Sequence, residues 1–532
     1  MYKYLPKKVP KPPSKIGVVQ LTLITYFLIC AGPYGIEETV SATGPFFALL
    51  ATAVLPIVLS LPLSMLCSEM GSIFPMRGST VVWASSISTQ IIKAEQNAQT
   101  ERKLKTSKVL ARFYTNFLVM KAVCVNAIPP SLICGYLANL IPDVQIWYFK
   151  ILVTIVSFVL VGILNVMGID GSGWAQYGFA AFVLTPVFIF VAMSGPYWET
   201  WKVEPQNKPA SMDCGLLFSN LVWQCTGFDQ SANLSGEVDR PQFTYPVSLI
   251  LVVFLVIVSF FVPIISGVMI EPNSEAWHNG AFSQISLRLK GCESGWLQYW
   301  FIIAGAISSL SVLNAYVTCT SRELYCNASN GLLPFGKWIA KLRSFKKKAK
   351  KVEQVADVEK PDEANEGYIG EEELQRALTE TFINSGEEED LSYVPFASIL
   401  VVSICPIFMQ LLSFEELLTV GSFLIGCSMF CQLILFWYQR HGKYGYWANN
   451  EASPTQFHVK GGYFGTIAII LTPLISCVLL WYFQGWQPLV VIAIGQLFLF
   501  GLYGLESLVG RKQRVVTGYD LLQSESQVKA EI

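Results

Sequence analysis

Long apolar runs alternate with short polar segments along almost the whole chain. Two of these runs, at 151–163 and 248–269, contain no Asp, Glu, Lys or Arg. A helix needs roughly 20 apolar residues to cross a hydrocarbon core of about 30 Å, and a soluble protein rarely repeats such runs many times in one chain. The pattern therefore predicts an all-α polytopic membrane protein with about twelve transmembrane helices.

The twelve predicted spans follow the apolar runs along the chain. They cover residues 16–43, 45–67, 110–141, 147–166, 174–194, 215–235, 247–269, 297–320, 394–412, 417–437, 463–483 and 488–508.

Basic residues predict how these spans are oriented, because Lys and Arg are enriched in cytoplasmic loops. With this number of spans, the basic clusters and both termini fall on one side of the membrane. We therefore predict cytosolic tails at 1–15 and 509–532, membrane regions at 16–334 and 394–508, and a long charged cytosolic loop at 335–393. The clusters contain Lys3, Lys7, Lys8, Lys11 and Lys15, then Lys93, Arg102, Lys103, Lys105 and Lys108, the bases of 337–351, Arg440 and Lys443, and Arg511, Lys512 and Arg514.

Composition agrees with a membrane protein and narrows the function. Hydrophobic residues make up 52% of the 532 residues and charged residues 14%, well below the roughly 25% of soluble chains. The net charge of −1 carries no signature of a nucleic-acid partner. The chain has no Cys/His metal spacing and no nucleophile elbow, so we expect no catalytic residue, no metal site and no enzyme. Cys214 and Cys292 fall in loops opposite the basic clusters, and spacing leaves open whether they form a disulfide.

The first and sixth spans are interrupted at corresponding places. Residues 32–38 read GPYGIEE and residues 223–229 read WQCTGFD, so each break puts an acid, Glu37 or Asp229, two residues after a Gly. Broken backbone at membrane depth is tolerated where it lines a cavity, and an ionisable residue there is a functional candidate. The alternative is a simple kink whose acid caps the second half-helix. Two such breaks, five spans apart, favour a transporter with an inverted repeat and a midplane substrate site.

Short motifs accompany the breaks in a fixed order along the membrane part. They are GPYGIEETV at 32–40, SEMG at 68–71, FPMRG at 74–78, VW at 82–83, LN at 164–165 with Gly168, GFD at 227–229, SGEVDRP at 235–241, SR at 321–322, GLLP at 331–334 and SFEE at 413–416. In order and spacing they resemble the amino acid–polyamine–organocation (APC) superfamily of permeases, and within it the polyamine-uptake and L-type amino acid transporter subgroup.

This resemblance implies a five-plus-five inverted repeat with broken helices 1 and 6, two further C-terminal helices, and alternating access in the plasma membrane. It implies a substrate site between the two breaks, assisted by spans three and eight, and no cofactor. An aromatic ring such as that of Phe228 is suited to gating the site or stacking on a cation. The candidate substrate-binding residues are Gly32, Tyr34, Gly35, Glu37, Asn126, Trp223, Gly227, Phe228 and Asp229.

Two departures from the subgroup concern charge. Val125 stands before Asn126 where the subgroup tends to have an acid, so one cation-binding charge is missing. Lys121, within the third span, either snorkels to an interface, pairs with an acid, or stands in for a coupling cation. The fifth span, 174–194, contains no Lys, which leaves proton coupling and uncoupled exchange both open.

The sequence favours a secondary transporter of a cationic amino compound, such as arginine, ornithine or a polyamine. A positive charge on the substrate would offset the burial of two midplane acids. The alternatives are a neutral amino acid exchanger and a non-transporting nutrient receptor of the same fold. A channel is least favoured. The expected partners are a small-molecule amino acid or polyamine and membrane lipid.

Overall fold

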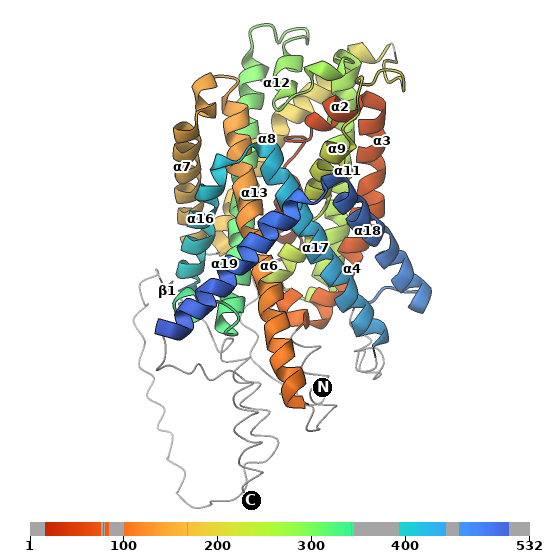
Figure 1. Cartoon of the computed structure of the whole chain (residues 1–532). Coiled ribbons are helices and arrows are strands. Elements are labelled where there is room, and N and C mark those ends of the chain that lie inside the picture. The colour runs from red at the N-terminus through yellow and green to blue at the C-terminus, as the bar shows by residue number, and fades with distance from the viewer. Residues whose placement is uncertain are drawn as a thin grey trace, which may run out of the picture.

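The part of the chain that the structure describes is mostly helical (Figure 1). β1 (Arg343–Ser344) and β2 (Tyr393–Val394) are strands of two residues each that pair antiparallel. The all-α polytopic fold predicted from the sequence is confirmed. The computed structural model describes residues 16–75, 78, 80–84, 100–167, 169–199, 201–341, 343–344, 393–442 and 457–509.

Within those ranges, nine helical segments are long and apolar enough to cross a membrane. The first, Pro45–Ile73, is continuous although a π-helical turn interrupts its hydrogen-bond pattern. The segments comprise α3 (Pro45–Leu55) with η2 (Pro56–Ser60) and α4 (Leu61–Ile73), α6 (Thr100–Leu137), α7 (Trp147–Val166), α8 (Ile169–Met193), α11 (Pro241–Ile270), α13 (Trp296–Ser329), α17 (Phe414–His441), α18 (Gly462–Gln484) and α19 (Gln487–Val509).

The three other predicted spans coincide with shorter helices. The span predicted at 16–43 consists of α1 (Val18–Ile29) and α2 (Glu38–Thr43), and the span at 394–412 consists of α16 (Phe396–Phe408) and η7 (Met409–Leu411). The span at 215–235 divides into α9 (Cys214–Cys225), α10 (Phe228–Ser231) and η5 (Ala232–Glu237). Both predicted breaks are therefore present, while the inverted repeat stays a prediction.

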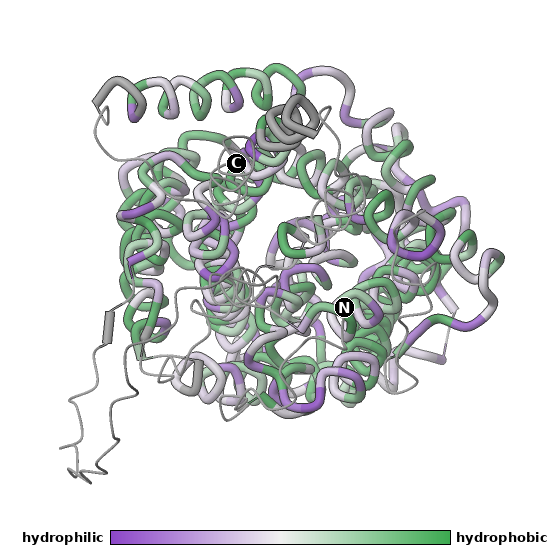
Figure 2. Tube along the Cα trace, turned by 90° about the horizontal axis from the view of Figure 1, so that it is seen from below, coloured by the Kyte–Doolittle hydropathy of each residue, from purple (hydrophilic) through white to green (hydrophobic). Residues whose placement is uncertain are grey.

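The long helices differ in how much neighbouring helices cover them. Within the most apolar stretch of each helix, 78% of the residues of α6 and of α13 are buried inside the protein, whereas only 17% of those of α19 are buried. Figure 1 shows α19 crossing the outside of the bundle, and Figure 2 shows hydrophobic residues along the helices at its rim. Apolar residues at the rim are expected where lipid is the solvent. α6 and α13 form the centre of the bundle, and the functional site lies beside them.

Short elements connect the helices. They are η3 (Pro142–Gln145), η4 (Gly195–Glu199), η6 (Ser274–Ala276), α12 (Ala281–Ser286) and α14 (Gly336–Ile339).

Two sequence questions concern the loops. Cys214 and Cys292 are both free thiols, so the disulfide left open by the sequence is not formed in this structure. Most of the charged loop predicted at 335–393, together with the tails predicted at 1–15 and 509–532, lies outside the described residues. Their cytosolic placement stays a prediction.

Candidate functional site

The first break separates α1 from α2 and depends on two glycines. Gly32 and Gly35 have φ angles of +93° and +83°, which L side chains rarely adopt. The backbone carbonyls freed by the break are held by side chains from distant helices. Ser308 of α13 donates to the carbonyl of Ala31 at 2.8 Å, and Asn220 of α9 donates to that of Gly35 at 2.9 Å. The break is thus a defined structure, built between three helices.

Glu37 lies just before α2 and is fully buried. Its carboxylate accepts hydrogen bonds from the Gly35 N–H at 2.7 Å, from the Tyr136 hydroxyl at 3.0 and 3.1 Å, and from the Gly280 N–H at 3.3 Å. Tyr136 belongs to α6 and Gly280 precedes α12. We call this cluster the Glu37 tie, because it joins the first break to both of those elements.

The second break separates α9 from α10 at Gly227, whose φ angle is +110°. Gly227 lies directly against the first half-helix: a Cβ added to it would be 3.1 Å from the carbonyl oxygen of Leu28. Ser60 of η2 donates to the carbonyl of Cys225 at 2.7 Å. The two broken helices therefore touch where each is interrupted, and only a residue without a side chain fits this contact.

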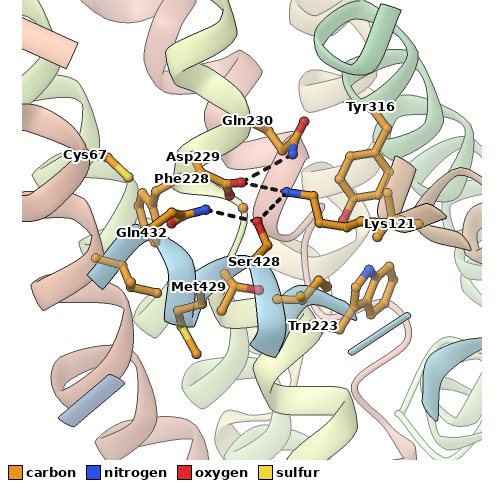
Figure 3. Close-up of a pocket in the computed structure, with 15 residues that line it drawn as sticks. Cys67, Lys121, Trp223, Phe228, Asp229, Gln230, Tyr316, Ser428, Met429 and Gln432 are labelled. Atoms are coloured by element: carbon orange, nitrogen blue, oxygen red, sulfur yellow. Dashed lines mark hydrogen bonds and ion pairs between the residues drawn. The ribbon is translucent and has the colours of Figure 1, made fainter. Parts of the chain in front are cut away.

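An ion pair follows the second break (Figure 3). The ammonium of Lys121, on α6, lies 2.8 Å from Asp229, and the two side chains are 4% and 12% exposed. Lys121 also donates to Ser428 of α17 at 3.2 Å, and Gln432 donates to the same hydroxyl at 3.3 Å. Gln230 donates to the Asp229 carboxylate at 3.4 Å. The sequence left three roles open for Lys121, and in this structure its ammonium pairs with an acid.

Lys121 and Asp229 line a cavity between α4, α6, α10, α13 and α17, which we call the Asp229 cavity. Aromatic rings of Trp223, Phe228 and Tyr316 form much of its wall, and Figure 3 shows Tyr316 beside the Lys121 side chain. Charged groups surrounded by aromatic and apolar side chains are the usual composition of a small-molecule site.

A second cavity, the Tyr34 cavity, is lined by the first break together with Leu132, Gln224 and Ser308. Tyr34 itself donates to the carbonyl of Val183 on α8 at 3.0 Å. Trp223 lines both cavities. Because the lining residues follow one another along α6 and α13, the two cavities lie one after the other along the bundle with this indole between them.

The nine residues predicted for the site fall into three groups. On the Asp229 cavity the structure brings together Trp223, Gly227, Phe228 and Asp229. Tyr34 lines the other cavity, also with Trp223. The remaining predicted residues, which line neither cavity, are Gly32, Gly35, Glu37 and Asn126. Asn126 instead joins α6 to α13 through a hydrogen bond of 3.1 Å to Thr320.

Sequence reasoning left Ser428 and Gln432 out of the candidate site. A signal existed, because these polar residues are four apart, and so on one helix face, within the apolar span predicted at 417–437. Glu323 was also left out, because the eighth span was ended at residue 320. Among the described residues, no group of three or more His, Cys, Asp or Glu side chains could hold a metal ion.

Two ion pairs lie at the end of the bundle opposite α12. Arg322 of α13 pairs with Glu237 at 2.8 Å, and Arg440 of α17 pairs with Glu69 of α4 at 3.3 Å. The start of the described chain joins the first pair, since the Ile16 N–H donates to the carbonyl of Glu237 at 3.2 Å. Except for Arg440 and Ile16, these residues belong to the motifs at 68–71, 235–241 and 321–322. Those motifs therefore help to close this end of the bundle.

The comparison with known families decides the classification. The profile of the amino acid permease family matches residues 16–504. The chain belongs to this family. Membership confirms the predicted relation to the APC superfamily and accords with an integral membrane protein.

Several curated relatives carry more specific names. A protein of Arabidopsis thaliana named as a probable polyamine transporter is 27% identical over 332 residues, covering 62% of each chain. The polyamine transporter PUT1 of Oryza sativa subsp. japonica is 26% identical, covering 61% of this chain and 57% of its own. The polyamine transporter RMV1 of Arabidopsis thaliana is 28% identical, covering 60% and 62%. The chain thus spans about three fifths of the length of the relatives it matches.

Proposed function

We propose that this permease-family protein is a secondary transporter of a small cationic amino compound, either an amino acid or a polyamine. The observation that carries the proposal is the Asp229 carboxylate, which lines a cavity beside the contact of two broken helices. A carboxylate in such a place has a function by default, because burying it costs free energy. The names of the relatives, which are polyamine transporters, support the same substrate class.

In this proposal a substrate ammonium group takes the place of the Lys121 ammonium at Asp229. Charge-assisted hydrogen bonds to a carboxylate are about twice as strong as neutral ones. The rings of Trp223, Phe228 and Tyr316 surround the same cavity, and aromatic faces attract cations. The remainder of a longer substrate would extend past Trp223 toward Ser308 and the Tyr34 cavity.

We further propose alternating access in the plasma membrane, with both termini cytosolic. Both cavities lie between the Glu37 tie at the α12 end and the Arg322–Glu237 and Arg440–Glu69 pairs at the other end. Transport requires that the contacts at one end of the bundle open while those at the other end stay closed, as when one group of helices rocks against another. The positions of the Glu37 tie and the two ion pairs at opposite ends of the bundle support this cycle.

The test is uptake into proteoliposomes of labelled arginine, ornithine, putrescine, spermidine and leucine. Each substrate is offered with and without a proton gradient, and with and without unlabelled substrate inside. Saturable uptake of a cation that is lost in Asp229→Asn supports the proposal, whereas unchanged cation uptake in that variant contradicts it. Asp143→Asn, an exposed change of the same chemistry on η3, is the matched control. Asp229→Glu, which retains the charge opposite Lys121, provides a second variant if Asp229→Asn is poorly folded.

A neutral amino acid exchanger is the second candidate. The observation in its favour is the 2.8 Å ion pair of Lys121 with Asp229. Because the two charges cancel, the cavity lining would suit a neutral substrate. Leucine uptake that requires internal leucine, together with no cation uptake, would establish this function instead.

A further inference from the structure

Glu323 is a buried acid that no part of the proposed function uses. It lies on α13, two turns beyond Tyr316, and is 3% exposed. Among the residues that the structure describes, neither of its carboxylate oxygens has a hydrogen-bond partner at ordinary distance, and the Gln230 amide, which acts on it from farther away, carries no charge. A buried charge without a partner is strongly destabilising unless something neutralises it. A proton, or a cationic side chain that reaches the carboxylate, can supply this neutralisation.

The neighbours of Glu323 connect it to the Asp229 cavity. Tyr136 of α6 lies against Gly305 of α13, and Asn126 of α6 donates to Thr320 of α13 at 3.1 Å, so the two helices run antiparallel and Lys121 and Glu323 follow these contacts on facing helices. Lys121 and Asp229 both act electrostatically on the Glu323 carboxylate. The adjacent base Arg322 is already paired with Glu237 at 2.8 Å. Two acids thus share one lysine, and the cluster lacks one positive charge.

The Lys121 side chain is suited to serve either acid. Its ammonium is held by Asp229 at 2.8 Å and by the Ser428 hydroxyl at 3.2 Å. A lysine has a flexible four-carbon stem and three rotatable donors, so its ammonium can turn between neighbouring carboxylates by rotation of the side chain.

We propose that Lys121 is a tethered internal cation that passes from Asp229 to Glu323 when a cationic group of the substrate binds at Asp229. This inference rests on the transport of a cationic substrate proposed above. Before binding, Glu323 is unpaired; after binding, the substrate neutralises Asp229 and Lys121 neutralises Glu323. Each charge of this cluster then has a partner of opposite charge only when one cationic group is bound. Lys121 and Glu323 therefore set how many positive charges the site accepts.

The test uses the full-length protein in proteoliposomes, with arginine and putrescine as probes that carry one and two net positive charges. In Glu323→Gln the displaced lysine has no second acid, so KM for arginine should rise about tenfold. In Lys121→Met neither acid has the lysine to neutralise it, so the preference for putrescine over arginine should rise about tenfold. The double variant restores the original net charge, and its KM for arginine should return to within about threefold of the wild-type value.

The outcomes separate this inference from the proposed function. Asp229-dependent arginine uptake whose KM is unchanged in Glu323→Gln overturns the inference and leaves the proposed function standing. Wild-type protein that moves leucine alone overturns both. A double variant no better than Glu323→Gln would also overturn the inference, because a purely structural defect would not be rescued by removing the lysine. If Glu323→Gln is not recovered folded, the putrescine preference of Lys121→Met decides, and an unchanged preference overturns the inference. Glu293→Gln and Lys290→Met, on the exposed loop before α13, are the matched controls.

Discussion

Glu37→Gln separates two roles for the acid of the first break. As a substrate ligand, Glu37 would determine KM; as the centre of the Glu37 tie, it would determine the stability of the α12 end. All its described neighbours at the tie donate hydrogen bonds to it: the Gly35 N–H, the Tyr136 hydroxyl and the Gly280 N–H. A carboxylate can accept all of them, whereas an amide replaces one acceptor oxygen by a donor. The structure favours the second role, because Glu37 lines neither cavity.

The magnitude follows from the weakest of these contacts. The amide nitrogen would turn toward Gly280, whose distance of 3.3 Å is the longest, and keep the 2.7 Å contact with Gly35. One hydrogen bond to a charged acceptor is then lost, which costs about 1.5–3 kcal/mol. The loss falls on the contact between the first break and the loop before α12, so this end of the bundle should open more readily.

Two measurements on the same preparation test this reasoning. Thermal denaturation in detergent, followed by the fraction that stays monodisperse, should show a lower apparent melting temperature for Glu37→Gln. Uptake kinetics should show a changed maximal rate with KM within about twofold of wild type, because the cavity wall is intact. A tenfold higher KM with an unchanged melting temperature would refute the stabilising role of the Glu37 tie and indicate that Glu37 binds the substrate. Glu204→Gln, an exposed residue in the loop before α9, is the control.

Two further variants test the packing at each end of the bundle. In Gly305→Ala the added Cβ would lie 2.6–2.8 Å from three ring atoms of Tyr136, so overpacking should cost about 1–3 kcal/mol. Gly162→Ala, which meets nothing within 4 Å, should leave the melting temperature unchanged or higher, and equal melting of both variants would contradict the packing argument. Arg322→Gln removes the ion pair that Arg322 makes with the buried Glu237 and should lower stability by about 1.5–3 kcal/mol, the usual loss for a hydrogen bond to a charged group. The same denaturation assay checks it: unchanged melting would mean that the pair contributes nothing, whereas partial recovery in Arg322→Glu/Glu237→Arg would support it.

Much of the fold follows from local patterns. The span predicted at 147–166 coincides with α7 (Trp147–Val166), because a short turn-forming segment, Pro142–Gln145, precedes the apolar run and Gly168 follows it. The breaks were predictable because Gly and an acid at membrane depth conflict with an uninterrupted helix. Gly227 illustrates the limit of this reasoning: its sequence context indicates a break, but not that the break lies against Leu28.

The site was less predictable because its contacts are distant along the chain. Lys121 and Asp229 are separated by 108 residues, and Glu37 and Gly280 by 243. Glu323 was missed for a different reason. Polar residues after position 320 indicated the end of a span, yet α13 continues to Ser329 with Glu323 buried. Charged residues end a span where they meet water, whereas a helix inside a bundle can continue past an acid that neighbouring helices cover.

Trp223 stands between the Tyr34 and Asp229 cavities, and in the transport cycle proposed above its indole limits the width of a compound that passes from one cavity to the other. A compound small enough to enter one cavity but too wide to pass the indole can occupy that cavity without being carried. Such a compound would inhibit from one face of the membrane and have no effect from the other. The bulk of one side chain therefore separates compounds that are cargo from compounds that are blockers, and it makes blockade sided.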